Sequence, residues 1–227
     1  MSEIKHIAII VDGNRRWARG KNLPTLEGHK AGYARVKQLA RWIFNKGVPV
    51  ASFYLFSREN WSRTKEEVAY LFDLLDEGLK NDIADFVKDG IKLRFAGGRE
   101  QLRQSTRDLM TEAELKTAGG AKGTIVACIN YGGQQEIVEA VQSLALMGSD
   151  LTKLTPEALK NSLTTAGLPA VDLMIRTSGE QRISNFLLWD IAYAELYFTP
   201  KFFPDFSEQD LEEAITWYQD RDRRFGK

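Results

Sequence analysis

Short apolar runs alternate with longer amphipathic stretches along the chain. The short runs are rich in Ile, Val, Phe and Tyr, which predicts strands over residues 5–11, 48–57, 91–97, 123–130, 171–177 and 195–198. Between them, apolar residues recur with a helical period, which predicts helices over residues 28–47, 64–89, 100–118 and 134–147, with further helices beginning at Thr155 and Ser207. Parallel strands need crossover connections, so this alternation predicts an α/β fold with a parallel sheet and helices on both faces.

The start of the longest predicted helix has a recognisable sequence pattern. Thr64 and Glu67 have the spacing of a capping box, and the apolar residues that follow lie on one side of the helix up to Gly90. We therefore expect Glu67 to act locally, through the backbone at the start of that helix.

Composition limits the classes of protein that the chain can represent. It has 227 residues, 31 Lys and Arg against 31 Asp and Glu, and 43% hydrophobic residues, which is typical of one globular domain over residues 1–227. A net charge near zero gives no general attraction for nucleic acid, so we expect no nucleic-acid partner. The single cysteine, Cys128, lies within an apolar run without a cationic neighbour and is predicted to be a buried thiol.

The distribution of apolar residues also bears on membranes and location. No apolar stretch reaches the roughly 18 residues of a membrane span, so no transmembrane segment is expected. The first residues, MSEIKH, do not form a signal peptide, which favours a cytoplasmic protein. Peripheral contact with a membrane stays open.

Four of the predicted strands are followed by loops that are polar and rich in Gly or Arg. These loops are residues 12–16, 57–63, 130–133 and 176–184. Ligands of open parallel sheets bind at the carboxyl ends of the strands. We therefore expect the four loops to meet around one ligand-binding crevice.

The residues of these loops suit a diphosphate. Arg16, Arg63, Arg176 and Arg182 carry forked donors that match phosphate oxygens. Asp12 lies among them, and a lone carboxylate beside phosphates is a common ligand of Mg²⁺. On the residues alone, an Asp12 that caps its own loop and pairs with neighbouring arginines is an equally good interpretation.

Five long motifs carry a resemblance to a known family. HIAIIVDGNRRWA, GHKAG, FYLFSRENWSR, INYGGQQEI and DLMIRTSGEQRISNFLLWDIAYAELYF, together with the ending DRDRRFG, closely resemble the cis-prenyltransferases, the undecaprenyl diphosphate synthase family. The resemblance implies a homodimer with a central, mostly parallel six-stranded sheet and a hydrophobic tunnel. It also implies an enzyme that adds isopentenyl diphosphate to an allylic diphosphate with Z geometry, using Mg²⁺.

The same resemblance implies a role for each residue of the first motifs. Asp12 corresponds to the catalytic carboxylate that is linked to Mg²⁺. The residues that correspond to the allylic diphosphate site are Gly13, Asn14, Arg15, Arg16, Trp17, His29 and Arg63. Cationic donors there would stabilise the departing diphosphate as its negative charge grows.

Later motifs correspond to the site of the second substrate. Arg176, Arg182 and Ser184 match the isopentenyl diphosphate site, and Glu195 matches a carboxylate that assists metal binding. The loop that shapes the site and helps proton removal corresponds to Ser57, Asn60 and Trp61, with Ser57 and Asn60 as catalytic residues. In the tail, Arg224 and Gly226 match a motif that reaches the site of a neighbouring subunit.

Several of these residues also have a structural interpretation. His29 could bond backbone at a helix start, Trp61 could be a hinge that packs on the long helix, and Glu195 could pair with any nearby Arg. The ending around Arg224 could be a solvated helix end.

The sequence departs from the family pattern at three positions. Thr25 stands where many relatives carry Arg, so that contact would be missing or supplied by Arg19 or Lys21. Arg15 replaces a common Gly, and Gln181 replaces a common His, which puts a metal or proton-relay role at 181 in doubt.

Rival function classes lack their motifs. A trans-type isoprenoid synthase would need an Asp-rich DDxxD cluster, and a P-loop phosphotransferase would need GxxxxGK[ST]; the sequence has neither. A scaffolding subunit that has lost catalytic residues is the non-enzymatic alternative, but the core constellation is complete here.

One strand residue bears on product length. Side chains alternate along a strand, so Phe53 and Leu55 share the face of Ser57 and should line the tunnel. Long-chain members commonly have Ala at the position of Leu55, whereas Leu resembles the short-chain, Z-farnesyl-type enzymes. We therefore expect a short product, with a medium-length, undecaprenyl-type product as the alternative.

Overall fold

The computed structural model describes residues 3–221, and its centre is a six-stranded sheet. All six predicted strands are present, in the spatial order β3-β4-β2-β1-β5-β6, and every pairing is parallel. The sheet is thus wholly rather than mostly parallel. The strands are β1 (His6–Ile10), β2 (Val50–Ser57), β3 (Ile91–Ala96), β4 (Gly123–Tyr131), β5 (Leu173–Arg176) and β6 (Glu195–Phe198).

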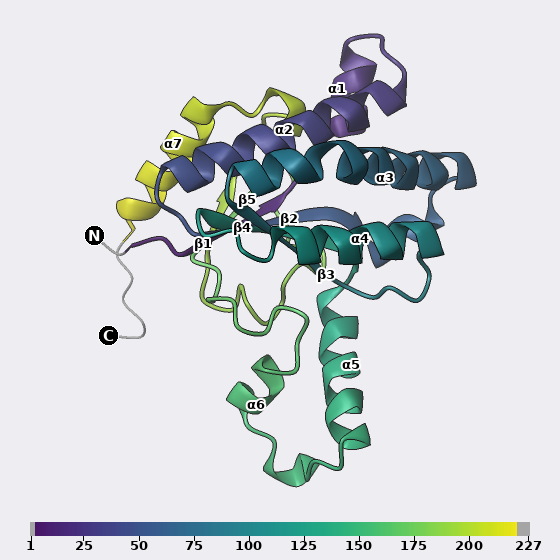
Figure 1. Ribbon diagram of the computed structural model, residues 1–227. Helices are drawn as coiled ribbons and strands as arrows, with labels where there is room; N and C mark the ends of the chain where they lie inside the picture. Colours follow the sequence, from purple (N-terminus) through teal and green to yellow (C-terminus); the bar gives the residue numbers. More distant parts are fainter. Residues whose placement is uncertain (1–2, 222–227) are drawn as a thin grey trace.

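The α-helices are α1 (Asn14–Gly20), α2 (Thr25–Asn45), α3 (Lys65–Lys88), α4 (Gln104–Thr117), α5 (Gly133–Leu146), α6 (Pro156–Lys160) and α7 (Glu208–Gln219). Three 3₁₀ turns are η1 (Arg58–Ser62), η2 (Leu151–Lys153) and η3 (Phe203–Asp205). Helices α2, α3, α4 and α7 cover one face of the sheet, whereas α5 and α6 project from the other face (Figure 1). That other face, on which helices were also predicted, is covered by the segment between β5 and β6. None of the helices within residues 3–221 is long and apolar enough to cross a membrane.

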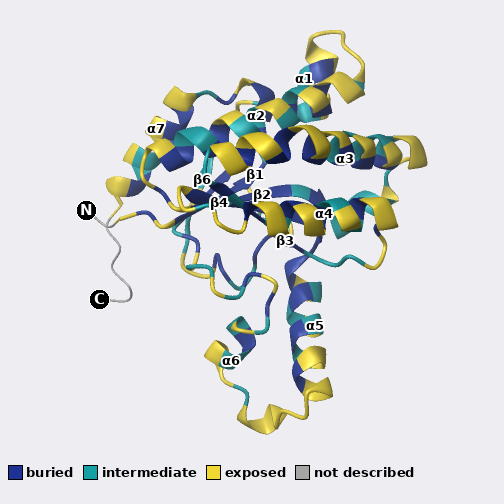
Figure 2. Cartoon of the chain, viewed as in Figure 1, coloured by how far each residue is buried: buried dark blue, intermediate teal, exposed yellow. Residues whose placement is uncertain are grey.

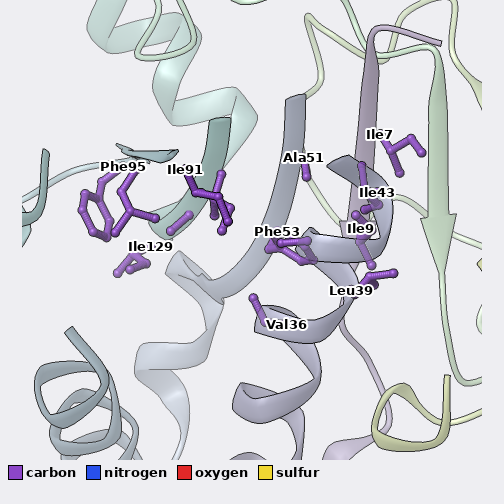
Figure 3. Close-up of a cluster of buried hydrophobic side chains, with 14 of the residues drawn as sticks. Ile7, Ile9, Val36, Leu39, Ile43, Ala51, Phe53, Ile91, Phe95 and Ile129 are labelled. Carbon is purple, nitrogen blue, oxygen red and sulfur yellow. The ribbon is translucent and has the colours of Figure 1, made fainter. Parts of the chain in front are cut away.

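The larger core lies between the sheet and α2, α3, α4 and α7. On this face the strands present alternate residues such as Ile7, Ile9 and Phe53, all fully buried. Val36 and Leu39 of α2 pack against them (Figure 3). The helical period of the apolar positions in these segments is therefore satisfied by one continuous core.

A second core lies on the opposite face of the sheet. It is built from the other alternate strand residues and from the segment between β5 and β6, including Phe186 and Leu187. Cys128 is fully buried here, so the prediction of a buried thiol is confirmed, and burial raises the pKa of that thiol. Beyond this core α5 and α6 pack on each other, and the tip that joins them is exposed (Figure 2).

Three helices begin directly after the capping residues that the sequence predicts. Thr155 and Ser207 cap α6 and α7 as predicted, by accepting hydrogen bonds from backbone N–H groups in the first turn. At α3, Thr64 accepts from the backbone N–H of Glu67 at 3.3 Å, but the reciprocal bond of a capping box is absent from this helix start. The carboxylate of Glu67 instead faces His29 of α2.

Candidate active site

A cleft of about 570 Å³ lies over the carboxyl ends of β1, β2 and β5. Three of the four predicted loops line it, those that follow these strands. The fourth, residues 130–133, lies beside it and lines a separate small pocket with Arg58 and Glu136. Among the residues around the cleft are Asp12, Asn14, His29, Ser57, Asn60, Arg63, Arg176 and Ser184. A neighbouring hollow continues it past Gly13, Arg15, Arg16 and Arg19.

The exit of β1 turns sharply at Gly13, which has a φ of 102°. A Cβ there would lie 2.8 Å from the ring of Phe202 and 2.9 Å from Cβ of Ser178, so the turn needs both the freedom and the small size of glycine. The carbonyl of Asp12 accepts from Thr177 Oγ1 at 2.7 Å. This hydrogen bond joins the loops that follow β1 and β5.

Asp12 and Arg176 form the centre of the cleft. Arg176 Nη2 donates to Asp12 Oδ2 at 3.0 Å, and Nη1 donates to Ser184 Oγ at 2.8 Å. The side chain of Arg176 is only 5% exposed, and its Nε has no hydrogen-bond partner in the described part of the chain. Asp12 is 31% exposed and faces the open cleft. The pair therefore presents a carboxylate to the cleft that the buried Arg176 holds in position.

Two further arginines stand at the rim and share one carboxylate. Arg16 lies 3.4 Å from both Asp12 and Glu180 and also donates to the hydroxyl of Ser178. Arg182 pairs with Glu180 at 2.5 Å and is 60% exposed. Because these pairs are solvent-exposed, they hold the guanidinium groups weakly and leave them free to bind an anion.

The glycines of GHKAG let α1 approach α2 closely. A Cβ on Gly28 would lie 2.1 Å from the carbonyl oxygen of Asn14, and one on Gly32 would lie 2.6 Å from its Oδ1. The amide of Asn14 donates to the carbonyl of Val11 at 3.3 Å, while its buried Oδ1 has no partner within residues 3–221. The motif thus places Asn14 at the wall of the cleft.

Glu67 is the functional residue that the sequence analysis did not identify. Its carboxylate accepts from His29 Nε2 at 3.1 Å and from Arg63 Nη1 at 2.9 Å, and it lies 3.6 Å from Arg15. The side chain is 11% exposed. Burial lowers the pKa of His29 below its ordinary value, an effect that Glu67 opposes. One carboxylate therefore positions three of the predicted diphosphate-binding side chains.

The loop after β2 is held by hydrogen bonds and by a ring contact with α3. Ser57 and Asn60 form a reciprocal capping box around η1, with the backbone N–H of Ser57 donating to Asn60 Oδ1 at 3.1 Å. Trp61 stacks on Phe72 of α3 with 5.4 Å between ring centroids, and its N–H donates to Asn130 at 2.8 Å. Trp61 thus packs on the long helix, whereas Ser57 and Asn60 line the cleft.

The residues on the outer side of α1 differ in whether they line the site. Trp17 donates to Asp205 at 2.7 Å and carries Lys21 4.4 Å above its ring, so it lies outside the cleft lining. Arg19 does line the hollow beside the cleft. Of the two residues considered in place of the arginine missing at Thr25, Arg19 lines the hollow, whereas Lys21 contacts Trp17 and Asp205.

An apolar pocket of about 90 Å³ continues from the cleft between β2, α2 and α3. Leu55 lines both the cleft and this pocket, as predicted. Phe53 does not line either one, contrary to the prediction, because it lies one step deeper and is fully buried against α2. A register irregularity with β4 also turns Phe56 toward the same core as Phe53, so strict alternation ends before Ser57.

Glu195 lies far from Asp12 within this chain. It begins β6 and pairs in register with Leu173, which pairs with Ile7, so it lies five residues before Asp12 along the strand direction, about 16 Å. Its carboxylate lies 3.5 Å from Arg221. Within residues 3–221 no group of three or more His, Cys, Asp or Glu side chains could hold a metal ion. The predicted tail residues Arg224 and Gly226 lie outside the described residues.

Comparisons with known proteins bear directly on this site. Residues 10–226 match the family model described as "Putative undecaprenyl diphosphate synthase". An isoprenyl transferase of Agrobacterium fabrum is 42% identical over 98% of this chain and 92% of its own length. The chain belongs to the undecaprenyl diphosphate synthase family.

Other members of the family extend the comparison. A ditrans,polycis-undecaprenyl-diphosphate synthase of Vibrio cholerae, specific for (2E,6E)-farnesyl diphosphate, is 42% identical over 98% of this chain and 90% of its own. Lavandulyl diphosphate synthase from Lavandula x intermedia, solved in complex with dimethylallyl diphosphate, superposes with a TM-score of 0.94 at 32% identity, over 99% of this chain and 98% of that one. The chain is therefore a cis-prenyltransferase, and its fold is that of these enzymes.

Proposed function

We propose that this cis-prenyltransferase condenses isopentenyl diphosphate with an allylic diphosphate to give a short Z-prenyl diphosphate. In the reaction the allylic carbon–oxygen bond breaks and diphosphate leaves. A carbon–carbon bond forms to isopentenyl diphosphate, whose loss of a proton completes the new Z double bond. The observation that carries the proposal is the position of Leu55, where the charged cleft narrows into the apolar pocket.

The allylic diphosphate is assigned to the hollow over α1. Arg15, Arg16 and Arg63 border it; Glu67 holds Arg15 and Arg63 in position, and the exposed pair of Arg16 with Glu180 is one that an incoming diphosphate can replace. Positive groups fixed where the leaving diphosphate gains charge lower the barrier of the bond-breaking step. Holding both substrates side by side makes the alkylation effectively unimolecular.

Mg²⁺ is the proposed metal, and the donor set fits it in a limited way. Asp12 is a partly exposed carboxylate whose oxygens already accept from Gly13 and Arg176, so it can offer one further lone pair toward the cleft. Mg²⁺ bound there would neutralise charge on the diphosphate. The remaining ligands would be diphosphate oxygens and water, since Glu195 of the same chain lies at the other end of its strand.

Isopentenyl diphosphate is assigned to the opposite rim, at Arg176, Arg182 and Ser184. The buried Nε of Arg176 has no hydrogen-bond partner within residues 3–221, and the pair of the exposed Arg182 with Glu180 is one that an incoming diphosphate can replace. Ser57 and Asn60 lie across the cleft from these residues in a fixed turn. They are proposed to orient the substrate for proton removal.

Product analysis tests this function. The purified chain, given isopentenyl diphosphate, an allylic primer and Mg²⁺, should form a short product, and Leu55→Ala should lengthen it by several isoprene units. A wild-type product already at undecaprenyl length would instead support the medium-chain alternative, which the names of the 42% identical relatives favour. No product from the chain alone would support the scaffolding alternative.

We also propose that the active form is a homodimer whose tails complete the sites in trans. In its favour, Arg182 is exposed at the rim, and Glu195 begins an edge strand far from Asp12 of its own chain. Deleting residues 224–227 should impair the use of isopentenyl diphosphate without unfolding the protein. Mixing this variant with Arg182→Ala should restore part of the activity, and no recovery would contradict shared sites.

A further inference from the structure

A second contact between α2 and α3 lies beyond His29, at Tyr33. The hydroxyl of Tyr33 donates to Asp82 Oδ2 at 2.7 Å. Lys37 Nζ donates to both oxygens of Asp82 at 2.9 Å and lies 5.3 Å from the centre of the Tyr33 ring. The phenol is therefore held at its outer end by a half-buried ion pair, while its ring lines the apolar pocket.

The lack of a side chain at Gly78 leaves room for the Tyr33 phenol against α3. A Cβ on Gly78 would lie 2.0 Å from the hydroxyl oxygen of Tyr33 and 2.2 Å from Cζ. Gly78 lies in the middle of a helix, where glycine is unfavourable, and its backbone is not left-handed. Glycine is needed at this position for space, because the Tyr33 ring lies directly against the helix backbone.

The two contacts between α2 and α3 lie at opposite ends of the pocket. His29 meets Glu67 beside the cleft, and Tyr33 meets Gly78 at the far end. Four positions separate the contacts on α2, about 6 Å, but eleven separate them on α3, about 16 Å. The α3 residues that line the pocket all fall between the two contacts; they are Leu71, Phe72, Leu74 and Leu75.

The geometry points to Tyr33 as a specificity-determining residue that limits product length, in series with Leu55. This inference rests on the proposed function, in which a prenyl chain grows from the cleft past Leu55 into the pocket. The cleft and pocket share Asn14, His29 and Leu55 in their linings, so a chain that passes Leu55 next meets the Tyr33 ring. Tyr33 cannot turn aside without losing Asp82 and its place on Gly78.

A set of double variants tests this serial arrangement. Product lengths are measured with isopentenyl diphosphate in excess for the wild type, Leu55→Ala, Leu55→Ala with Tyr33→Ala, and Leu55→Ala with Tyr33→Phe. We expect Leu55→Ala to lengthen the product and Tyr33→Ala to lengthen it again by several isoprene units. Tyr33→Phe keeps the ring and loses only the bond to Asp82, so it should match Leu55→Ala alone.

Two results would overturn the inference. One is a Leu55→Ala, Tyr33→Ala product no longer than that of Leu55→Ala, and the other is equal lengthening by the Ala and Phe variants, which would assign the effect to the hydroxyl. Thermal melting checks that each variant is folded, and Tyr33→Leu, which is shorter than the phenol but still apolar, replaces an alanine variant that does not fold.

The proposed short product can fail independently of Tyr33. If the wild type already forms a medium-length product and Leu55→Ala changes nothing, the short-chain proposal fails. Tyr33→Ala alone then decides the inference, since lengthening supports it and an unchanged product overturns it.

Discussion

The polar cleft and the apolar pocket share one wall but are built in different ways. In the cleft, the cations are paired with carboxylates of the chain, as in Arg63 with Glu67 and Arg16 with Glu180. In the pocket, shape is set by packed side chains and by the ring of Tyr33 against Gly78. Charge in the cleft can exchange partners when a diphosphate enters, whereas the length of the pocket is fixed by steric contact.

This difference separates chemistry from product length. Substitutions among the paired charges should change rates and substrate affinities and leave product length unaltered. Substitutions at Leu55 or Tyr33 should change product length. Asn14 and His29, the polar residues of the wall that cleft and pocket share, are the places where the separation can fail.

The largest expected effect is that of Asp12→Ala. It removes the carboxylate at the centre of the cleft, and loss of one such electrostatic group costs about 10²–10³-fold in turnover. Arg176 keeps its bond to Ser184, so the fold should survive. Steady-state turnover is compared with that of Asp73→Ala, an exposed carboxylate on α3 outside the cleft. Near-normal turnover, or a changed length of the residual product, would contradict the separation.

A methyl group on the shared wall should affect both regions. In Gly32→Ala the new Cβ would lie 2.6 Å from Asn14 Oδ1, and such overpacking costs about 1–3 kcal/mol of folding free energy. Displacing Asn14 should lower turnover and broaden the product distribution together. Gly20→Ala is the matched control, since nothing lies within 4 Å of its added Cβ. Urea denaturation and product analysis measure the two effects, and an unaffected Gly32→Ala protein would remove Asn14 from the shared wall.

Glu67→Gln should affect the cleft alone. The amide fills the same space but cannot hold His29 and Arg63 as a carboxylate does, and charged hydrogen bonds contribute about 1.5–3 kcal/mol. We expect KM for the allylic diphosphate to rise about tenfold, the equivalent of 1.4 kcal/mol. Glu66→Gln, one residue away and exposed, is the control. The positioning role is wrong if the two variants have the same KM, and product length should be that of the wild type in both.

Glu67 also shows where sequence reasoning reaches its limit. Its spacing from Thr64 fits a capping box, a local pattern that is complete within four residues. That its carboxylate turns to His29 depends on how α2 and α3 pack, which no local pattern contains. The same holds for α1, whose short polar sequence has no apolar period and whose helix rests on the close approach of Gly28 and Gly32.

Other parts of the site followed from simple rules. The five strands other than β6 could be predicted because buried parallel strands are largely continuous apolar runs; β6 lies at the edge of the sheet and none of its four residues is buried. Asp12, Arg176 and Ser184 could be expected together because carboxyl ends of parallel strands meet at one edge. Alternation along β2 predicts on which face of the sheet a side chain lies, but not how deeply it is buried. Phe53 was therefore predicted to line the cavity with Leu55, although it lies in the core. Glu195 was assigned to the metal by resemblance alone, although as the first residue of a parallel strand it lies at the end of the sheet opposite the crevice.

The smallest expected effect is the dependence of stability on pH through His29. Burial keeps the pKa of folded His29 below 6.5, so the unfolded chain binds the proton first as the pH falls. Stability should therefore decrease from about pH 6.5 downward, by at most about 1.4 kcal/mol per pH unit for one proton. Besides Glu67, the charged groups that face His29 are Arg63 and Arg15.

The His29 contribution can be isolated with His29→Gln, whose amide still donates to Glu67. Burial also lowers the pKa of His6, which adds to the loss of stability in acid, whereas burial raises the pKa of Glu136, which opposes that loss. The stability of the wild type alone would therefore report the sum of all three groups. The difference between variant and wild type cancels the contributions of His6 and Glu136. Urea denaturation between pH 7 and about pH 5 should show a shallower loss in the variant. Equal slopes would mean that His29 is protonated as readily in the folded chain as in the unfolded one. Because His29 lines both the cleft and the pocket, product length measured over the same pH range shows whether its protonation affects the cleft alone or the pocket as well.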